Sequence, residues 1–326
     1  MQESYQQLKQ TLKDRVKEHE LLARYTTMKI GGPADLFYEA KTQDELVLAI
    51  KEGRRLGVPV FILGGGTNIL IGDRGIRGLV IKNSTSSISI RGMKGNIQGG
   101  TSKGVVYVEA DSGVIMNKLV RFTVDEGLQG LEMQLGLPGT VGGAVFMNSK
   151  WTRPEGYVGD VVYQAMILTS DNILKLVPKS YFQFAYDTSI LQKTREYVVS
   201  VVFSLQHAHK DELWKTANDS IAYRRETQPQ GVLSLGCTFR NISRAQAMTL
   251  ATPNHTTSAG FLVDHAGLKG ATEGEAQISD RHANFIINKG KATASDVVKL
   301  ISRAKEQVKR QFGVELEEEI VRVGEF

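Results

Sequence analysis

Hydrophobic and polar positions along the chain predict helices separated by short strands. Apolar residues at helical spacing predict helices over residues 3–23, 44–56, 114–126, 207–225 and 294–312. Short apolar runs predict strands over residues 58–63, 78–81, 87–91, 105–110, 161–168, 173–177 and 197–205. Thr293, followed three residues later by Asp296, predicts a capping box at the start of the last helix. The pattern is typical of a mixed α+β fold.

The grouping of these elements predicts three parts. Residues 1–84 form a small β-α-β unit, and residues 85–205 form a mainly antiparallel sheet with one helix. Residues 206–326 form the third part, whose tail returns as an extended segment over residues 314–323.

Composition and charge indicate the class of protein and the cellular compartment to expect. With 326 residues and 41% hydrophobic content, the chain is long enough for a real core. The net charge of +5 is typical of a mildly basic soluble protein or of one that binds phosphates, and without a long basic run it does not favour nucleic acid. Cys237 is the single cysteine, so no internal disulfide is possible and a cytoplasmic location is expected. No signal peptide and no membrane-spanning run are expected either.

Two glycine-rich segments are the first candidates for chemistry. Residues 63–68 follow a predicted strand, and three successive glycines let backbone N–H groups approach a pyrophosphate. Residues 136–144 contain four glycines and a proline, and we expect a loop around a flat or phosphorylated cofactor, not a packed core element. A tight turn is the alternative for each. Neither segment matches a Walker A loop, so a P-loop NTPase is not expected.

Cys237 and the run Glu317-Glu318-Glu319 are further candidates. Such a lone cysteine is more often an inert small hydrophobe, but a thiol of ordinary pKa, about 8.5, is mostly protonated at neutral pH and can donate a proton. If the glutamates lie in a strand, Glu317 and Glu319 share one face; a solvated charge run is the alternative. No cysteine or histidine pairing suggests a metal site.

Eight segments, in this order, resemble motifs of the UDP-N-acetylenolpyruvoylglucosamine reductase family, the MurB flavoenzymes. They are residues 25–34 (YTTMKIGGPA), 63–70 (LGGGTNIL), 136–144 (GLPGTVGGA) with 147–148, 236–241 (GCTFRN), 259–262 (AGFL), 267–270 (GLKG), 279–285 (SDRHANF) and 316–320 (LEEEI). No single segment is decisive, but eight in the right order make a specific signal.

This resemblance implies a vanillyl-alcohol-oxidase-type (PCMH-type) fold, in which two α+β subdomains bind FAD and a C-terminal α+β domain binds substrate. It implies that NADPH reduces FAD and that the flavin passes a hydride to the enolpyruvyl group of a UDP-sugar, which yields UDP-N-acetylmuramate for peptidoglycan synthesis. The implied FAD-binding residues are Ile62, Leu63, Gly64, Gly65, Gly66, Thr67, Asn68, Gly136, Pro138, Gly139, Thr140, Gly142, Gly143 and Ala144.

The resemblance also implies roles at the substrate. Cys237 takes the position of the family's proton-donating serine, and Glu319 takes that of a glutamate that assists at the carboxyl group or the enol. Asn241 and His282 fall at positions that line the substrate pocket.

Three segments depart from the family pattern. Asp187 stands where an arginine steadies the substrate carboxylate, and Thr227-Gln228-Pro229 lacks the usual lysine. Residues 149–151 (SKW) replace small residues. The candidates to compensate for the missing cations are Arg224, Arg225 and Arg240.

Other functions stay open at this point: the same scaffold acting on another substrate, or a flavin- or nucleotide-binding protein without turnover. Residues 243–258 are a hypothetical lid over the substrate.

Overall fold

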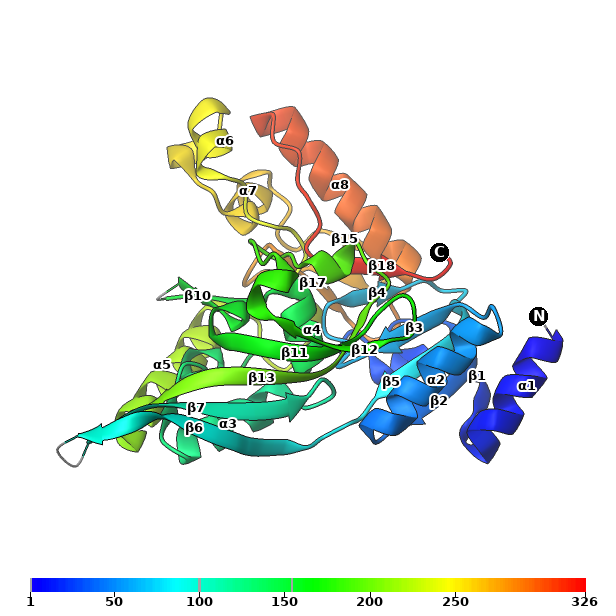
Figure 1. Cartoon of the computed structure of the whole chain (residues 1–326). Coiled ribbons are helices and arrows are strands. Elements are labelled where there is room, and N and C mark those ends of the chain that lie inside the picture. The colour runs from blue at the N-terminus through cyan, green and yellow to red at the C-terminus, as the bar shows by residue number, and fades with distance from the viewer. Residues whose placement is uncertain (1, 99–100, 154) are drawn as a thin grey trace. The chain divides into compact units, whose positions relative to one another are not determined.

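The computed structural model describes residues 2–98, 101–153 and 155–326. The chain divides into two compact units, each assembled from segments that are distant in the sequence (Figure 1). Unit 1 comprises Met1–Val16, Tyr38–Gly65 and Val80–Arg224, and unit 2 comprises Lys17–Phe37, Gly66–Leu79 and Arg225–Phe326. The three-part division at residues 84 and 205 stays a prediction.

A six-stranded antiparallel sheet forms the framework of unit 1. Its order is β12-β11-β13-β7-β6, and β8 pairs with β13. The strands are β6 (Ile88–Gln98), β7 (Thr101–Asp111), β8 (Leu128–Gln129), β11 (Val162–Leu168), β12 (Leu174–Pro178) and β13 (Tyr197–His207). The antiparallel sheet predicted from the short apolar runs is therefore confirmed.

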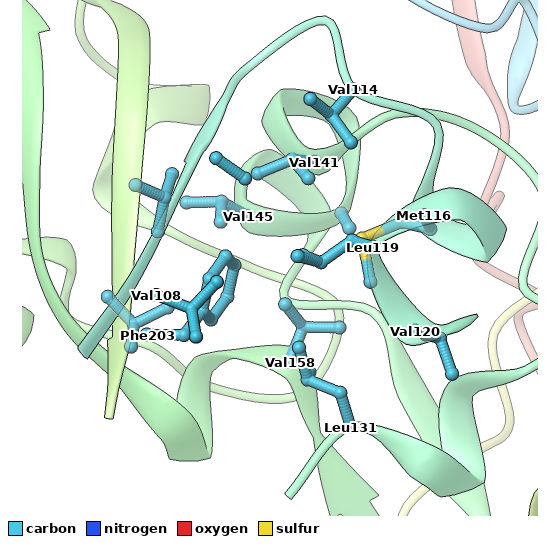
Figure 2. Close-up of a cluster of buried hydrophobic side chains, with 14 of the residues drawn as sticks. Val108, Val114, Met116, Leu119, Val120, Leu131, Val141, Val145, Val158 and Phe203 are labelled. Carbon is cyan, nitrogen blue, oxygen red and sulfur yellow. The ribbon is translucent and has the colours of Figure 1, made fainter. Parts of the chain in front are cut away.

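The core of unit 1 lies between this sheet and its helices. Alternate residues of β7 and β13 point into the core, among them Val108 and Phe203. The helices are α3 (Met116–Asp125), α4 (Val141–Met147) and α5 (Lys210–Thr227). Figure 2 shows Val141 and Val145 of α4 in the same cluster of buried side chains as Val108 and Phe203.

Helix α4 corrects one expectation, because residues 136–144 were expected to form a loop and the last four of them lie in this helix. The valines supply an apolar side that the sheet buries, and Thr140 caps the helix. Burial of these two side chains therefore outweighs the low helix propensity of the adjacent glycines.

The remaining elements of unit 1 include α1 (Gln2–Leu12), α2 (Gln43–Arg55), β3 (Val60–Leu63), β9 (Lys150–Thr152) and β10 (Glu155–Tyr157). The predicted helix over residues 3–23 is wrong beyond Leu12. The chain turns there and forms β1 (Lys17–Leu21), whose backbone pairs antiparallel with β2 (Pro33–Ala40). Strand pairing thus overrides the helical spacing of the last apolar residues. The pair of β1 and β2 belongs to unit 2 as far as Phe37, and β5 spans Ile76–Asn83.

Unit 2 combines a four-stranded sheet with three helices. The sheet has the order β14-β17-β16-β15, and a short parallel pair joins β4 to β18. The strands are β4 (Ile69–Ile71), β14 (Leu233–Cys237), β15 (Thr272–Glu273), β16 (Ala276–Ile278), β17 (Phe285–Asn288) and β18 (Val321–Val323). The helices are α6 (Arg244–Thr249), α7 (Ala259–His265) and α8 (Ala294–Phe312).

Helix α8 confirms its prediction to the residue. Thr293 and Asp296 form the expected capping box, and Gly313 ends the helix. Its apolar side packs into the core of unit 2, with Leu300 and Ile301 fully buried. The hypothetical lid, residues 243–258, contains α6 and a short 3-10 turn, and its movement stays a prediction.

Candidate functional site

The two glycine-rich segments meet in unit 1. Gly64 directly follows β3, and the ammonium group of Lys82 on β5 donates a 2.6 Å hydrogen bond to the Gly64 carbonyl. A Cβ atom at Gly64 would lie only 2.6 Å from Thr140 Oγ1, so the close approach of the two segments requires glycine. Burial lowers the pKa of Lys82 below its usual range.

The start of α4 presents bare backbone. Thr140 Oγ1 accepts a hydrogen bond from the Gly143 amide at 3.4 Å, and the Gly142 amide donates to the Ser112 carbonyl at 2.8 Å. A Cβ atom at exposed Gly143 would meet no described heavy atom closer than Thr140 Oγ1, at 3.6 Å. A surface without side chains allows a flat or phosphorylated group to approach the main chain closely.

The first glycine segment is shared between the units. Ile62 to Gly65 belong to unit 1, whereas Gly66, Thr67 and Asn68 belong to unit 2. The Asn68 side chain donates a 3.1 Å hydrogen bond to the carbonyl of Glu319. Its backbone carbonyl accepts the amide of Val321 at 2.9 Å. Asn68 is therefore hydrogen-bonded to the residues on both sides of Ile320.

Cys237 lies at an irregular end of β14. Ser234 pairs with Ile287 and Cys237 with Phe285, so β14 has one residue more than β17 over this stretch. This β-bulge includes Gly236, whose φ of +84° favours glycine. Bulges next to functional sites often redirect a side chain. The Cys237 side chain is partly exposed.

Thr238 connects the segment of Cys237 to that of Glu319. The Glu319 amide donates a 2.8 Å hydrogen bond to the Thr238 carbonyl. Phe239 and Glu318 form an antiparallel bridge beside this bond. The carboxylate of Glu318 forms ion pairs with Lys305 and Arg322. Glu318 is thus tied to α8, while Glu319 follows the Cys237 segment.

His282 and Asn241 also lie in unit 2. His282 Nδ1 accepts a hydrogen bond from the Asn284 amide at 3.3 Å, and a Cβ at Gly260 would lie 2.9 Å from its Cε1. Burial lowers the pKa of His282, which favours the neutral imidazole. Asn241 Oδ1 accepts the Ala259 amide at 3.1 Å, at the start of α7. The predicted residues Cys237, Glu319, Asn241 and His282 therefore belong to one unit.

Comparisons with known proteins decide the family. A family model described as UDP-N-acetylenolpyruvoylglucosamine reductase, C-terminal domain, matches residues 228–323, and one described as FAD binding domain matches residues 34–175. A UDP-N-acetylenolpyruvoylglucosamine reductase of Anoxybacillus flavithermus is 38% identical over 312 residues, which cover 95% of this chain and 94% of that protein. The chain belongs to the UDP-N-acetylenolpyruvoylglucosamine reductase family.

Solved structures agree with this family. The reductase (MurB) of Thermus caldophilus matches 95% of this chain and 99% of its own, with a TM-score of 0.75 and 30% identity. A VAO-type flavoprotein of Myceliophthora thermophila matches with a TM-score of 0.57 over 95% of this chain and 85% of its own. At 10% identity it shows the fold alone. The predicted family and the predicted FAD-binding fold of the vanillyl-alcohol-oxidase type are confirmed.

Asp187, which the resemblance places at the position of an arginine, occupies a turn in unit 1. It has a φ of +52° and is 5% exposed, and Gln192 Nε2 donates to its carbonyl at 2.9 Å. Aspartate tolerates this left-handed conformation better than most residues. Desolvation, the hydrogen bond to Glu155 and the negative charges of Glu155 and Asp187 raise the pKa of Tyr157 to about 12.

Arg224 lies against the second glycine segment, not within unit 2. A Cβ at Gly136 would lie 2.9 Å from Arg224 Cδ, and the guanidinium carbon is 4.5 Å from the centroid of the Trp151 ring. The unusual Trp151 therefore supports Arg224 through a cation–π contact. The role of Arg224 toward substrate stays a prediction.

Sequence reasoning missed Lys82, Ser112 and Asn284. The signal for Lys82 was a lysine directly after the predicted strand at residues 78–81. Asn284 stood in the reductase-family segment 279–285, of which only His282 was given a role. Ser112 carried no local signal, since it contributes its backbone carbonyl to Gly142.

Over residues 2–98, 101–153 and 155–326, no helix is both long and apolar enough to cross a membrane. The same part of the chain contains no group of three or more histidine, cysteine or acidic side chains suited to a metal ion.

Proposed function

We propose that the chain catalyses the FAD-dependent reduction of UDP-N-acetylglucosamine enolpyruvate to UDP-N-acetylmuramate, with NADPH as the reductant. Family membership across 95% of the chain supports this proposal. The observation that carries it is the 2.8 Å hydrogen bond from the Glu319 amide to the Thr238 carbonyl. This bond joins the segment of the proposed acid, Cys237, to the segment of the proposed carboxylate.

The residues present fit the cofactor. Gly143 would face the flavin nucleotide with bare backbone, while Gly64 and Gly142 let the chain pack closely against Thr140 and Ser112 beside it. Lys82 binds the Gly64 carbonyl, so an ammonium group lies beside this glycine segment and would attract an anion. When bound, FAD supplies the two-electron chemistry, accepting a hydride from NADPH and giving one to the enolpyruvyl double bond.

Cys237 would supply the proton that completes the reduction. When a hydride joins one alkene carbon, the electron pair of the double bond moves to the other carbon, next to the carboxylate. The Cys237 thiol gives its proton to that carbon, and the thiolate later regains a proton from water. A thiol is more acidic than the serine hydroxyl that the family uses, so the transfer is chemically reasonable.

The remaining proposed residues, Glu319, His282 and Asn241, would contact the substrate. Glu319 would assist at the carboxyl group of the substrate or at its enol, which is the role that the resemblance to the family implies. His282 would contact substrate as a neutral imidazole, because burial lowers its pKa. Asn241 would line the same pocket, with its Oδ1 already bound to the Ala259 amide. We infer a cytoplasmic enzyme, since the single Cys237 is best kept reduced there.

The flavin spectrum tests both half-reactions without oxygen. We expect NADPH to bleach the visible absorbance and the enolpyruvyl substrate to restore it. Cys237→Ser is the matched variant, because it introduces the family's hydroxyl and should still reoxidise. Cys237→Ala should lose about 10²-fold or more in the reoxidation rate, with bleaching by NADPH unchanged.

Three outcomes would contradict parts of this proposal. Wild-type reoxidation by Cys237→Ala would remove Cys237 from the role of acid. Bleaching without colour return in the wild-type protein would point to a different substrate. Failure to bind FAD after reconstitution would overturn the proposed activity altogether.

A further inference from the structure

Asn284 makes three hydrogen bonds to the two residues that follow Cys237. Its Oδ1 accepts the Phe239 amide at 2.8 Å, and its Nδ2 donates to the Phe239 carbonyl at 2.8 Å. Its own backbone carbonyl accepts the Thr238 amide at 2.7 Å. Asn284 is 3% exposed, so water competes little for these bonds.

The opposite side of the same short segment is bound to the glutamate run. The Thr238 carbonyl accepts the Glu319 amide at 2.8 Å, and the Arg240 amide donates to the Glu317 carbonyl at 2.9 Å. Thr238 and Phe239 are therefore held between Asn284 and the segment that carries Glu319. A shift of this backbone would move the Cys237 side chain and the Glu319 backbone together.

The backbone directly before Cys237 is irregular. The bulge in β14 interrupts its regular pairing between Ser234 and Cys237. Gly236 is permissive, and a Cβ placed on it would meet no described atom within 4 Å. Cys237 itself pairs with Phe285, and the bonds to Thr238 and Phe239 hold the backbone on its C-terminal side.

We propose that Asn284 is a positioning residue that directs the Cys237 thiol and sets its placement relative to Glu319. The Asn284 amide also donates to His282 Nδ1 at 3.3 Å, so one residue orients three predicted site residues. This inference rests on the proposed function, in which Cys237 is the proton donor. Asn284 acts through the backbone of its neighbours and is not itself assigned a contact with substrate.

Asn284→Asp is the most specific variant, because aspartate has the shape of asparagine and keeps an oxygen that can accept the Phe239 amide. It removes the donor to the Phe239 carbonyl and places a carboxylate oxygen against that carbonyl instead. Asn288→Asp is the matched control at the other end of β17. Asn288 is also buried, and its Nδ2 donates to the Met28 carbonyl at 2.9 Å while its Oδ1 accepts the amides of Gly290 and Ala292.

The first measurement uses the single cysteine. Iodoacetamide alkylation as a function of pH reports on Cys237 alone, since the chain has no other thiol. We expect Asn284→Asp to change the alkylation rate by about 3-fold or more, or to displace its pH profile. Asn288→Asp should leave both as in the wild-type protein. This measurement needs neither NADPH nor the enolpyruvyl substrate, so it tests the positioning role even if the proposed activity fails.

The second measurement follows the flavin. We expect Asn284→Asp to slow reoxidation by the enolpyruvyl substrate about 10- to 100-fold, as small misplacements of reacting groups do. Bleaching by NADPH should be unchanged, and the substrate KM should change less than kcat. Asn288→Asp should lower the urea midpoint without changing either half-reaction.

The proposal is overturned if Asn284→Asp has the alkylation profile and the reoxidation rate of the wild-type protein. It is also overturned if Asn288→Asp slows reoxidation equally, because the effect would then be a general loss of order in the sheet. If Asn284→Asp does not fold, alkylation and flavin reoxidation are measured on Asn284→Ser instead. Serine is smaller, so water has room to bind the backbone groups of Phe239 and the variant should fold.

Discussion

Lys82 donates a 2.6 Å hydrogen bond to the backbone carbonyl of Gly64, which joins β5 to the first glycine-rich segment. Hydrogen bonds to charged groups contribute about 1.5–3 kcal/mol. We expect Lys82→Met to release this carbonyl and to raise the FAD dissociation constant about 10-fold. Titration of the apoprotein with FAD, followed by flavin fluorescence, measures the change.

Lys118→Met is the control for this prediction. Lys118 Nζ also donates to a backbone carbonyl, that of Ser86 at 3.3 Å, but the pair is exposed. Its loss should leave FAD affinity unchanged. Equal affinities for Lys82→Met and the wild-type protein would show that the Lys82 contact has no part in flavin binding.

Gly143→Ala should change stability and cofactor affinity in opposite directions. In the protein without FAD, alanine fits the open space at this position of α4 and stabilises the helix by up to about 1 kcal/mol. If FAD lies against this backbone, the added methyl group should weaken its binding about 10-fold or more. Urea unfolding and FAD titration give the two values. Gly92→Ala, at an exposed position of β6, should leave FAD affinity unaltered. Retained affinity in Gly143→Ala would place the cofactor elsewhere.

His282 should make the protein less stable in mild acid. Burial lowers its pKa in the folded state below the usual 6.5, so the unfolded chain binds more protons in that pH range. The free energy of unfolding should therefore fall as the pH drops from 7.5 through the folded pKa of His282. We expect His282→Gln to reduce this dependence relative to wild type, whereas His207→Gln, at an exposed position, should not. Parallel curves for His282→Gln and the wild-type protein would contradict the assignment.

The neighbours Glu318 and Glu319 should have separate effects. Burial raises the pKa of Glu318, but hydrogen bonds to Arg322 and Lys305 outweigh it and lower the net pKa below 4.5. Its stabilising contribution is therefore present above that pH and is lost as the pH falls through the folded pKa. We expect Glu318→Gln to cost about 1 kcal/mol of unfolding free energy, after allowance for solvent screening of the pair, with little change in turnover.

Glu319→Gln should do the reverse. We expect reoxidation of the flavin by substrate to slow about 10²-fold, with a urea midpoint close to that of the wild-type protein. Stopped-flow absorbance and equilibrium unfolding of both variants make the comparison. A larger loss of turnover in Glu318→Gln than in Glu319→Gln would show that the chemistry belongs to Glu318 and not to Glu319.

Local signals predicted α8 correctly because all of them lie within the helix or directly beside it. Thr293 and Asp296 satisfy each other's backbone amides, and the apolar side at helical spacing needs only some core to pack against. The eight motifs, which follow one another in the family's order, likewise predicted the family and the FAD-binding fold. They are short contiguous segments whose residue types are readable one by one.

Local signals failed where a partner distant in the sequence decides the conformation. Residues 17–21 have helical spacing, yet they form a strand because β2 offers backbone partners. Val141 and Val145 lie among glycines, yet they form a helix because Val108 and Phe203 bury them. Neither partner is visible within the segment itself.

The sequence by itself determined which chemical groups the protein carries: a lone thiol, three successive glutamates and two glycine-rich segments. Only the tertiary structure decided how they are held. Hydrogen bonds from Asn284 and Glu319 meet on Thr238 and Phe239, and Lys82 reaches the carbonyl of Gly64. Each of these bonds has a backbone group of Thr238, Phe239 or Gly64 as one partner. Backbone groups are the same in every residue except proline, so the pattern of side chains along the chain does not show which partner will bind them.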